Sequence, residues 1–195
     1  MNRTMSLLAA CSLPLFLAGC LSDDDDDEVV QPEPEFANVR VIHAASDAPL
    51  VNITANDAIL NNLESVDYQV ASGRFEVETG TYDIGVTAIL PGDNAEVLQA
   101  DVTLEADTNY DVFAVGSVAD DSLMLLPVTS TETSVTAGNA QVQIVHAASA
   151  APTVDIYVTA PDAMLADEQP LVTAEFTDAT DLVQVPAGEY RIRIT

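Results

Sequence analysis

The chain contains one short pattern twice, and this repeat constrains the fold more than any other feature. Residues 39–49 read VRVIHAASDAP, and residues 142–152 read VQIVHAASAAP. Residues 37–54 align on residues 140–157 at a constant offset of 103 and are identical at 10 of 18 positions. Such identity between distant segments indicates two copies of one module of about 90–100 residues.

Alternation of apolar and polar residues runs through short segments of the first copy and is typical of half-buried β-strands. Phe75 and Val77 fall on one side of residues 74–78, and charged residues fall on the other. Residues 110–115 are apolar on both sides except at Asp111, which indicates a central strand. We therefore expect an all-β protein of tandem antiparallel β-sandwiches, immunoglobulin-like or transthyretin-like, with the second copy incomplete.

Further strands are expected wherever turn residues bound an alternating segment, at 39–43, 51–54, 68–71, 82–87, 102–104 and 123–126. Residues 58–66 fit either a short helical turn or irregular chain. Residues 104–110 are similar to a tyrosine corner, in which a Tyr hydroxyl bonds to the backbone a few residues upstream. Residues 78–82 form a shorter version of the same pattern.

The repeat also predicts the domain boundaries. We expect a signal peptide at 1–19, a lipidated Cys and acidic tether at 20–36, a first module at 37–128, a Thr- and Ser-rich linker at 129–138 and a second module at 139–195.

The second copy matches the first only in part. Residues 183–195 repeat 75–87 at an offset of 108, and nothing in the sequence corresponds to residues 88–128. We expect the sequence to be a fragment of a longer product, and the alternative is a half-module completed by a partner chain. Either case predicts unpaired strand edges in the second copy.

The N-terminal segment predicts export and lipid attachment. Arg3 precedes an apolar run at 7–18, which is too short to cross a membrane as a stable helix. The run ends in Leu-Ala-Gly-Cys at 17–20, which resembles the bacterial lipoprotein signal, in which Cys20 carries diacylglycerol and becomes the new N-terminus. Leu21 resembles the outer-membrane-directed type. The alternative is ordinary secretion with Cys20 as a core or disulfide residue.

Six consecutive carboxylates follow at 23–28, and their mutual repulsion favours an extended, solvated tether over a cation site. The whole chain has 32 Asp and Glu against 5 Arg and Lys, a formal net charge of −27. This charge argues against nucleic-acid binding, because phosphates are repelled.

The doubled Val-x-Val-x-His-Ala-x-x-x-Ala-Pro-x-Val-x-Ile pattern, followed in each copy by a Gly-x-Tyr strand, resembles a bacterial family described as domain of unknown function 4397. The resemblance implies exported β-sandwich modules, often in tandem. It implies no activity and no catalytic residues, since the family has none assigned. Asp47 is replaced by Ala150 in the second copy, so the two modules cannot share a role that requires this acid.

His43 and His146 occupy the same position in the repeat and are the only histidines. A His three and four residues before Ser46 and Asp47 suggests a catalytic triad or a metal ligand, but one strand end does not supply converging groups. We therefore expect His43, Pro49, His146 and Pro152 to form a structural motif in which His bonds the backbone of the Ala-Pro turn. No catalytic, cofactor-binding or metal-binding residue is predicted.

The sequence favours a non-enzymatic lipoprotein of the cell envelope, in the outer membrane where two membranes are present. Its sandwiches would display surfaces for adhesion or for binding an envelope or extracellular protein or polysaccharide. The alternative is a module that binds a small ligand or calcium in loops at one end, with acids at Asp57, Asp93, Asp120 and Asp121. We rank an envelope hydrolase third.

Overall fold

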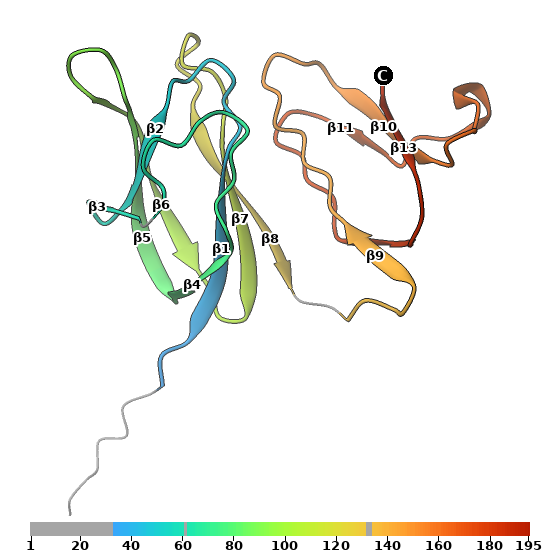
Figure 1. Cartoon of the computed structure of the whole chain (residues 1–195), viewed down its shortest axis with the longest axis horizontal. Helices are drawn as coiled ribbons and strands as arrows, with labels where there is room; N and C mark the ends of the chain where they lie inside the picture. Colours follow the sequence, from blue (N-terminus) through green and yellow to red (C-terminus); the bar gives the residue numbers. More distant parts are fainter. Residues whose placement is uncertain (1–32, 61, 132–133) are drawn as a thin grey trace, which may run out of the picture. The chain divides into compact units, whose positions relative to one another are not determined.

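The computed structural model describes residues 33–60, 62–131 and 134–195, and Figure 1 shows their arrangement. The predicted signal peptide, Cys20 and most of the tether lie outside the described residues. The described part consists of strands, loops and one short 3-10 turn, η1 (Leu165–Asp167). It contains no helix with the length and hydropathy needed to cross a bilayer. The expected all-β fold is confirmed.

The first copy is a sandwich of two four-stranded sheets (Figure 1). One sheet has the order β4-β1-β7-β8, and the other has the order β3-β2-β5-β6. The strands of the first sheet are β1 (Phe36–His43), β4 (Phe75–Glu78), β7 (Thr108–Val115) and β8 (Met124–Thr131). Those of the second are β2 (Val51–Ala55), β3 (Ala58–Ile59), β5 (Gly80–Ala88) and β6 (Ala95–Leu104).

The core of the first copy lies between these two sheets. Along β1 every second side chain is buried, from Ala37 through Val39 and Val41 to His43. Val51 and Ile53 of β2 and residues of β5, β6 and β7 pack against the first three of these side chains in one apolar cluster. Alternation along each strand therefore selects the face that is buried.

One pair of strands is parallel, which differs from the expected antiparallel sheets. β1 and β7 align from Asn38 beside Asn109 to His43 beside Ala114. A parallel pair needs a long crossover, and residues 44–107 supply it by forming β2 to β6. The alternation of residues 39–43 shows which side of β1 is buried but contains no information about the direction of its neighbour.

Two local predictions were wrong. Residues 68–71 form turns with a single bridge from Ala71 to Ile42, not a strand. β8 continues through Pro127 to Thr131, into the expected linker. This is possible because β8 is an edge strand of its sheet, where a missing N–H donor is tolerated.

The sequence of residues 58–66 fitted either a short helical turn or irregular chain. The described residues of this segment form no helix. Asn56 and Asp57 both have positive φ and form the two-residue turn between β2 and β3, a conformation that Asn and Asp tolerate well.

The second copy repeats the pairing of the first. Its strands are β9 (Asn139–Val142), β10 (Val154–Thr159), β11 (Val172–Ala174), β12 (Val183–Pro186) and β13 (Arg191–Ile194). β12 pairs with β9 as β4 pairs with β1, and β13 pairs with β10 as β5 pairs with β2. No strand of the described second copy corresponds to β6, β7 or β8.

Candidate functional site

The repeated histidine lies inside the first sandwich and not at its surface. His43 ends β1 and is 1% exposed. Its Nε2 lies 3.3 Å from the carbonyl oxygen of Pro49, so this nitrogen carries the proton and donates it. The bond joins the end of β1 to the loop that leads into β2. The predicted contact between His43 and the Ala-Pro turn is thus present.

The second copy makes the same contact with the same geometry. His146 Nε2 donates to the carbonyl oxygen of Pro152 at 3.2 Å, and His146 is also buried. The Nδ1 atom of His146 accepts a long bond of 3.4 Å from the amide of Ala148. The Nδ1 atom of His43 is buried without a hydrogen-bond partner among the described residues. Two loops of the chain therefore close in the same way around one imidazole each.

The triad arrangement that the sequence suggested does not assemble. Asp47 lies in an exposed loop and accepts bonds from the hydroxyl of Ser117 and from the amides of Val118 and Ala119, at 2.8–3.0 Å. These bonds, first among them the one from the Ala119 amide, lower the pKa of Asp47 from 3.8 to about 2. Asp47 therefore ties the loop after β1 to the loop between β7 and β8.

One further side-chain contact recurs in both copies. The hydroxyl of Ser72 accepts the amide of Val41, and the hydroxyl of Thr180 accepts the amide of Ile144, at 2.9 and 3.0 Å. The alignment of the repeat failed to draw attention to this pair because Ser and Thr are not identical. A comparison of hydroxyl-bearing residues, in place of identical ones, at the offset of 108 would have identified Ser72 and Thr180.

The predicted tyrosine contacts are present as well. Tyr82 donates its hydroxyl proton to the carbonyl of Glu78, and Tyr190 does the same to Pro186. The hydroxyl oxygen of Tyr110 accepts the amide of Glu105 at 3.0 Å. These side chains fix the turns that precede their strands, which is the role of a tyrosine corner.

The loop acids of the calcium alternative are not brought together. Asp57 follows β2, whereas Asp93 follows β5, and the two strands are antiparallel. Asp57 therefore lies at the opposite end of the sandwich from Asp93, and Asp120 and Asp121 lie between β7 and β8. Within residues 33–60, 62–131 and 134–195, no group of three or more His, Cys, Asp or Glu side chains is placed to hold a metal ion.

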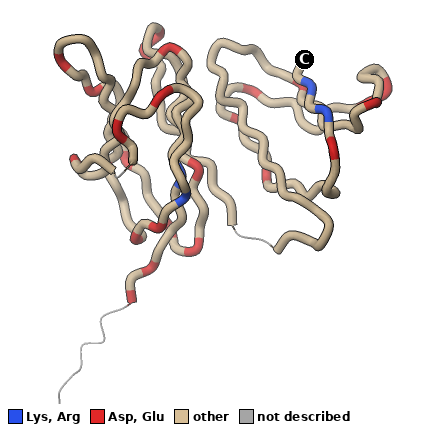
Figure 2. The backbone as a smooth tube through the Cα atoms, in the orientation of Figure 1, with Lys and Arg blue, Asp and Glu red and all other residues tan. Residues whose placement is uncertain are grey.

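Acidic residues are spread over both copies and far outnumber the basic residues, as Figure 2 shows. In the first copy Arg40 and Arg74 both bind Asp111. Arg40 Nε and Arg74 Nη2 donate to Asp111 Oδ1 at 3.0 and 2.6 Å, and Arg40 Nη2 donates to Oδ2 at 2.5 Å. This cluster was not predicted, because Asp111 was recognised only as a break in an apolar strand.

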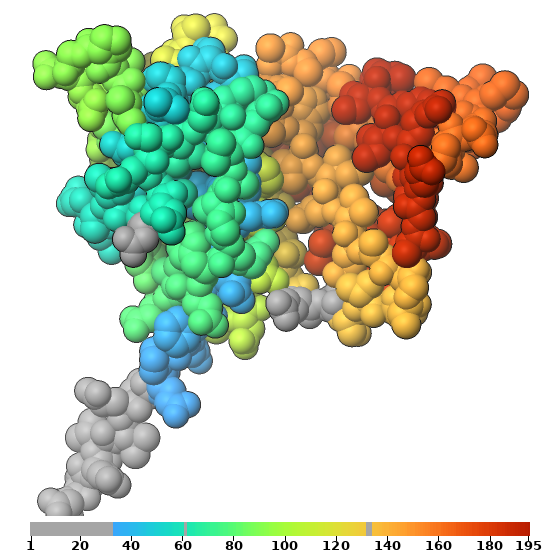
Figure 3. Space-filling view, viewed as in Figure 1, coloured from blue at the N-terminus to red at the C-terminus, as the bar shows by residue number. Residues whose placement is uncertain are grey.

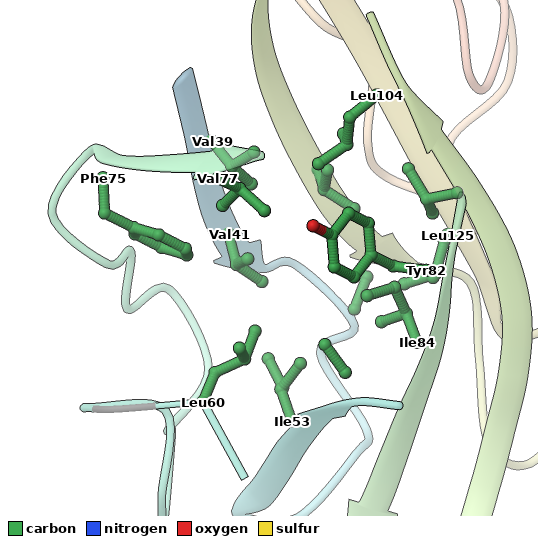
Figure 4. A pocket seen from close by; sticks show the side chains of 14 residues that line it. Val39, Val41, Ile53, Leu60, Phe75, Val77, Tyr82, Ile84, Leu104 and Leu125 are labelled. Carbon is green, nitrogen blue, oxygen red and sulfur yellow. The ribbon is translucent and has the colours of Figure 1, made fainter. Parts of the chain in front are cut away.

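A small apolar cavity of about 70 Å³ lies between the two sheets of the first copy, and side chains of both sheets point into it (Figure 4). Its lining includes Val41, Ile53, Leu60, Tyr82 and Leu104. Sites for drug-sized ligands are usually about 300 Å³ or larger. The cavity is accordingly a gap in the core of the sandwich, and its lining offers no charged group to a ligand.

The comparison with protein families confirms the family resemblance of the repeated pattern. The family model described as Domain of unknown function (DUF4397) matches residues 37–157. The chain belongs to this family. The match to DUF4397 spans the first copy, the linker and the second copy as far as Tyr157, and it includes both histidines and both prolines of the repeated motif. No curated protein matches the chain.

Proposed function

We propose that this DUF4397 protein is a non-enzymatic lipoprotein of the cell envelope whose sandwich modules bind a partner. The observation that carries the proposal is the structural role of the histidine in the repeated motif. In both copies the imidazole is buried and bonded to the carbonyl of the following proline, at 3.3 and 3.2 Å. Side chains committed to closing a loop are not available to a substrate.

The arrangement of the other polar groups supports the same proposal. A catalytic base needs a nucleophile within hydrogen-bond reach and a third group that orients it. Asp47 bonds the loop at 117–119, and His43 bonds Pro49. In the second copy Ala150 stands at the position of the acid Asp47, but the bond from the histidine to the proline carbonyl is retained there. The shared feature is therefore the loop closure.

Attachment through Cys20 is the part of the proposal that places the modules at the envelope. Cells producing the chain are grown with an alkyne-labelled fatty acid, and the label on the protein is measured after membrane fractionation. Wild type and the control Cys11→Ser are expected to carry label in the membrane fraction, whereas Cys20→Ser is expected to carry none. Label on Cys20→Ser equal to that on wild type would contradict the lipid anchor.

Binding is tested separately with the purified chain of residues 21–195. Its retention on immobilised outer-envelope vesicles and on the cell-surface polysaccharide of the same cells is measured by interferometry. A heat-unfolded sample of the same chain is the control. Saturable binding by the folded chain alone is expected. Equal retention of folded and unfolded chain, or none, would refute partner binding.

A further inference from the structure

The exposed apolar side chains of the first copy gather at one end of its sandwich. Eight large apolar residues of the described first copy are exposed, and only Phe36 and Ile59 lie at the end where β1 begins and β2 ends. The other six lie at or beside the ends of β1, β5 and β7: Leu50, Tyr68, Val70, Leu90, Val118 and Met124. Single exposed apolar residues are ordinary, but a group of them marks a surface for a partner.

Three loops at this end, residues 44–50, 89–94 and 116–123, form what we call the apical surface. Figure 3 shows them in cyan, green and yellow at the upper end of the first copy. Hydrogen bonds join the loops to one another. Asp47 accepts the amide of Val118 at 3.0 Å, and the amide of Ile89 donates to the carbonyl of Leu50 at 2.8 Å. A surface that is fixed before binding loses little conformational entropy when a partner docks.

The apical surface lies at the far end of the sandwich from the point where the chain enters it (Figure 1). β1 starts at Phe36, next to the expected tether, and ends at His43, which leads into residues 44–50. A strand of this length spans about 25 Å. A module tethered through Cys20 would therefore have its apical surface free for a partner.

An open hollow of about 240 Å³ lies where the apical surface meets the start of β6. Val97, Val118 and Leu123 supply its apolar lining, and Glu96 and Asp121 supply its charged lining. The amide of Asp121 donates to the carbonyl of Val118 at 3.2 Å, and this turn keeps the two residues together. Within the part of the chain that the structure describes, the two carboxylates bind no other side chain.

Apolar lining beside two carboxylates fits a Lys or Arg side chain. Both residues carry a charged head on an apolar stem, so the stem packs on apolar surface while the head meets the acids. The three loops contain no basic residue, and Arg40 and Arg74 both bind Asp111. The described first copy therefore offers the hollow no basic group of its own. The same acids repel phosphates and anionic lipid headgroups, which favours a polypeptide as the partner.

We propose that the hollow binds a Lys or Arg side chain of another protein, whose neighbouring apolar residues contact Leu50 and Leu90. This inference rests on the proposed partner-binding function and names the face that binds and the chemistry of the partner. The two acids select a basic residue, and the exposed apolar side chains supply affinity.

The test uses the chain of residues 21–195 and a short labelled synthetic peptide in which Arg and Leu alternate. Fluorescence anisotropy measures the affinity at low salt, and saturable binding is expected. The double substitution Glu96→Gln with Asp121→Asn is expected to weaken binding about tenfold, because both carboxylates of the hollow are lost. The matched control is Glu76→Gln with Glu78→Gln. It removes the same number of charges from exposed positions of β4 and is expected to bind within about twofold of wild type.

The apolar contact is tested separately with Leu90→Ser, which is expected to weaken binding about threefold. Ile59→Ser is the matched control, because Ile59 is equally exposed but lies at the opposite end, and it should leave the affinity unchanged. Hydrogen exchange at residues 117–123 is expected to slow in the complex. Both substituted side chains are exposed, so each variant should melt close to wild type.

Several results would overturn the proposal. One is the absence of saturable binding, and another is equal weakening by the two pairs of substitutions, which would show general attraction to an acidic protein. A peptide in which Glu and Leu alternate must also bind more weakly than the Arg and Leu peptide. Dimers in sedimentation that Glu96→Gln with Asp121→Asn dissociates would assign the hollow to a second copy of this chain, and this too overturns binding of another protein.

The vesicle assay distinguishes this proposal from partner binding itself. Retention on outer-envelope vesicles that Glu96→Gln with Asp121→Asn leaves unchanged would refute the apical site alone. Selective binding of the peptide, without retention of wild type on vesicles or polysaccharide, would confirm the site and refute the envelope partner.

Discussion

Replacing His43 with alanine tests whether the repeated motif stabilises the fold. The imidazole is 1% exposed, and its Nε2 bonds Pro49 at 3.3 Å. Removing a buried side chain of this size costs about 2–3 kcal/mol, and losing the hydrogen bond costs about 1 kcal/mol. His43→Ala should therefore lower the free energy of unfolding of the first copy by about 3–4 kcal/mol. For a domain of this size the midpoint of thermal unfolding should fall by roughly 12–32 °C.

The measurement is calorimetry of residues 21–195, in which the two copies can melt as separate transitions. Ser46→Ala is the matched control, because Ser46 belongs to the same motif but is exposed, and its substitution should change stability by less than about 0.5 kcal/mol. A His43→Ala midpoint within about 3 °C of wild type would refute the argument that the imidazole holds the loop.

Three further substitutions test other contacts of the first copy. Tyr110→Phe removes the acceptor of the Glu105 amide and should lower stability by about 1 kcal/mol in urea unfolding. Asp47→Ala should destabilise the chain near neutral pH. The pKa of Asp47 is lowered to about 2 in the folded state, so the stability that its carboxylate contributes is complete above pH 3.8 and is lost as the pH falls toward 2. The melting midpoints of Asp47→Ala and wild type should therefore converge as the pH is lowered across this range. Asp111→Asn leaves two guanidinium groups without their carboxylate and should cost about 1–2 kcal/mol at low salt. That cost should shrink in about 1 M salt, because screening weakens half-exposed ion pairs. A salt-independent loss would show that packing, not charge, is responsible.

The sequence predicted several contacts correctly because they are local. The bond from His43 to Pro49 spans six residues, and the bond from Tyr82 to Glu78 spans four. Over such distances the turn itself brings the partners together. The repeat supplied a second line of support, since a contact that recurs at His146 is a property of the module.

Contacts between distant segments could not be predicted in this way. Asp47 was recognised as part of the motif, but its partners at 117–119 lie about 70 residues away in the chain. Asp111 meets Arg40 and Arg74 only because β1 and β7 are neighbours. An unusual acid in a strand shows that a partner is needed, but the pattern along one strand does not show which of the five arginines, or which other donor, lies beside it.

The sequence by itself determined that the protein is all-β, that it repeats one module, and which side chains of strands such as β1 are buried. It did so because alternation reports the two faces of a strand directly. Only the tertiary structure decided that β1 and β7 are parallel and that Asp47 bonds a distant loop. Strand order depends on which faces and edges fit together across the whole module, and local periodicity contains no record of that choice.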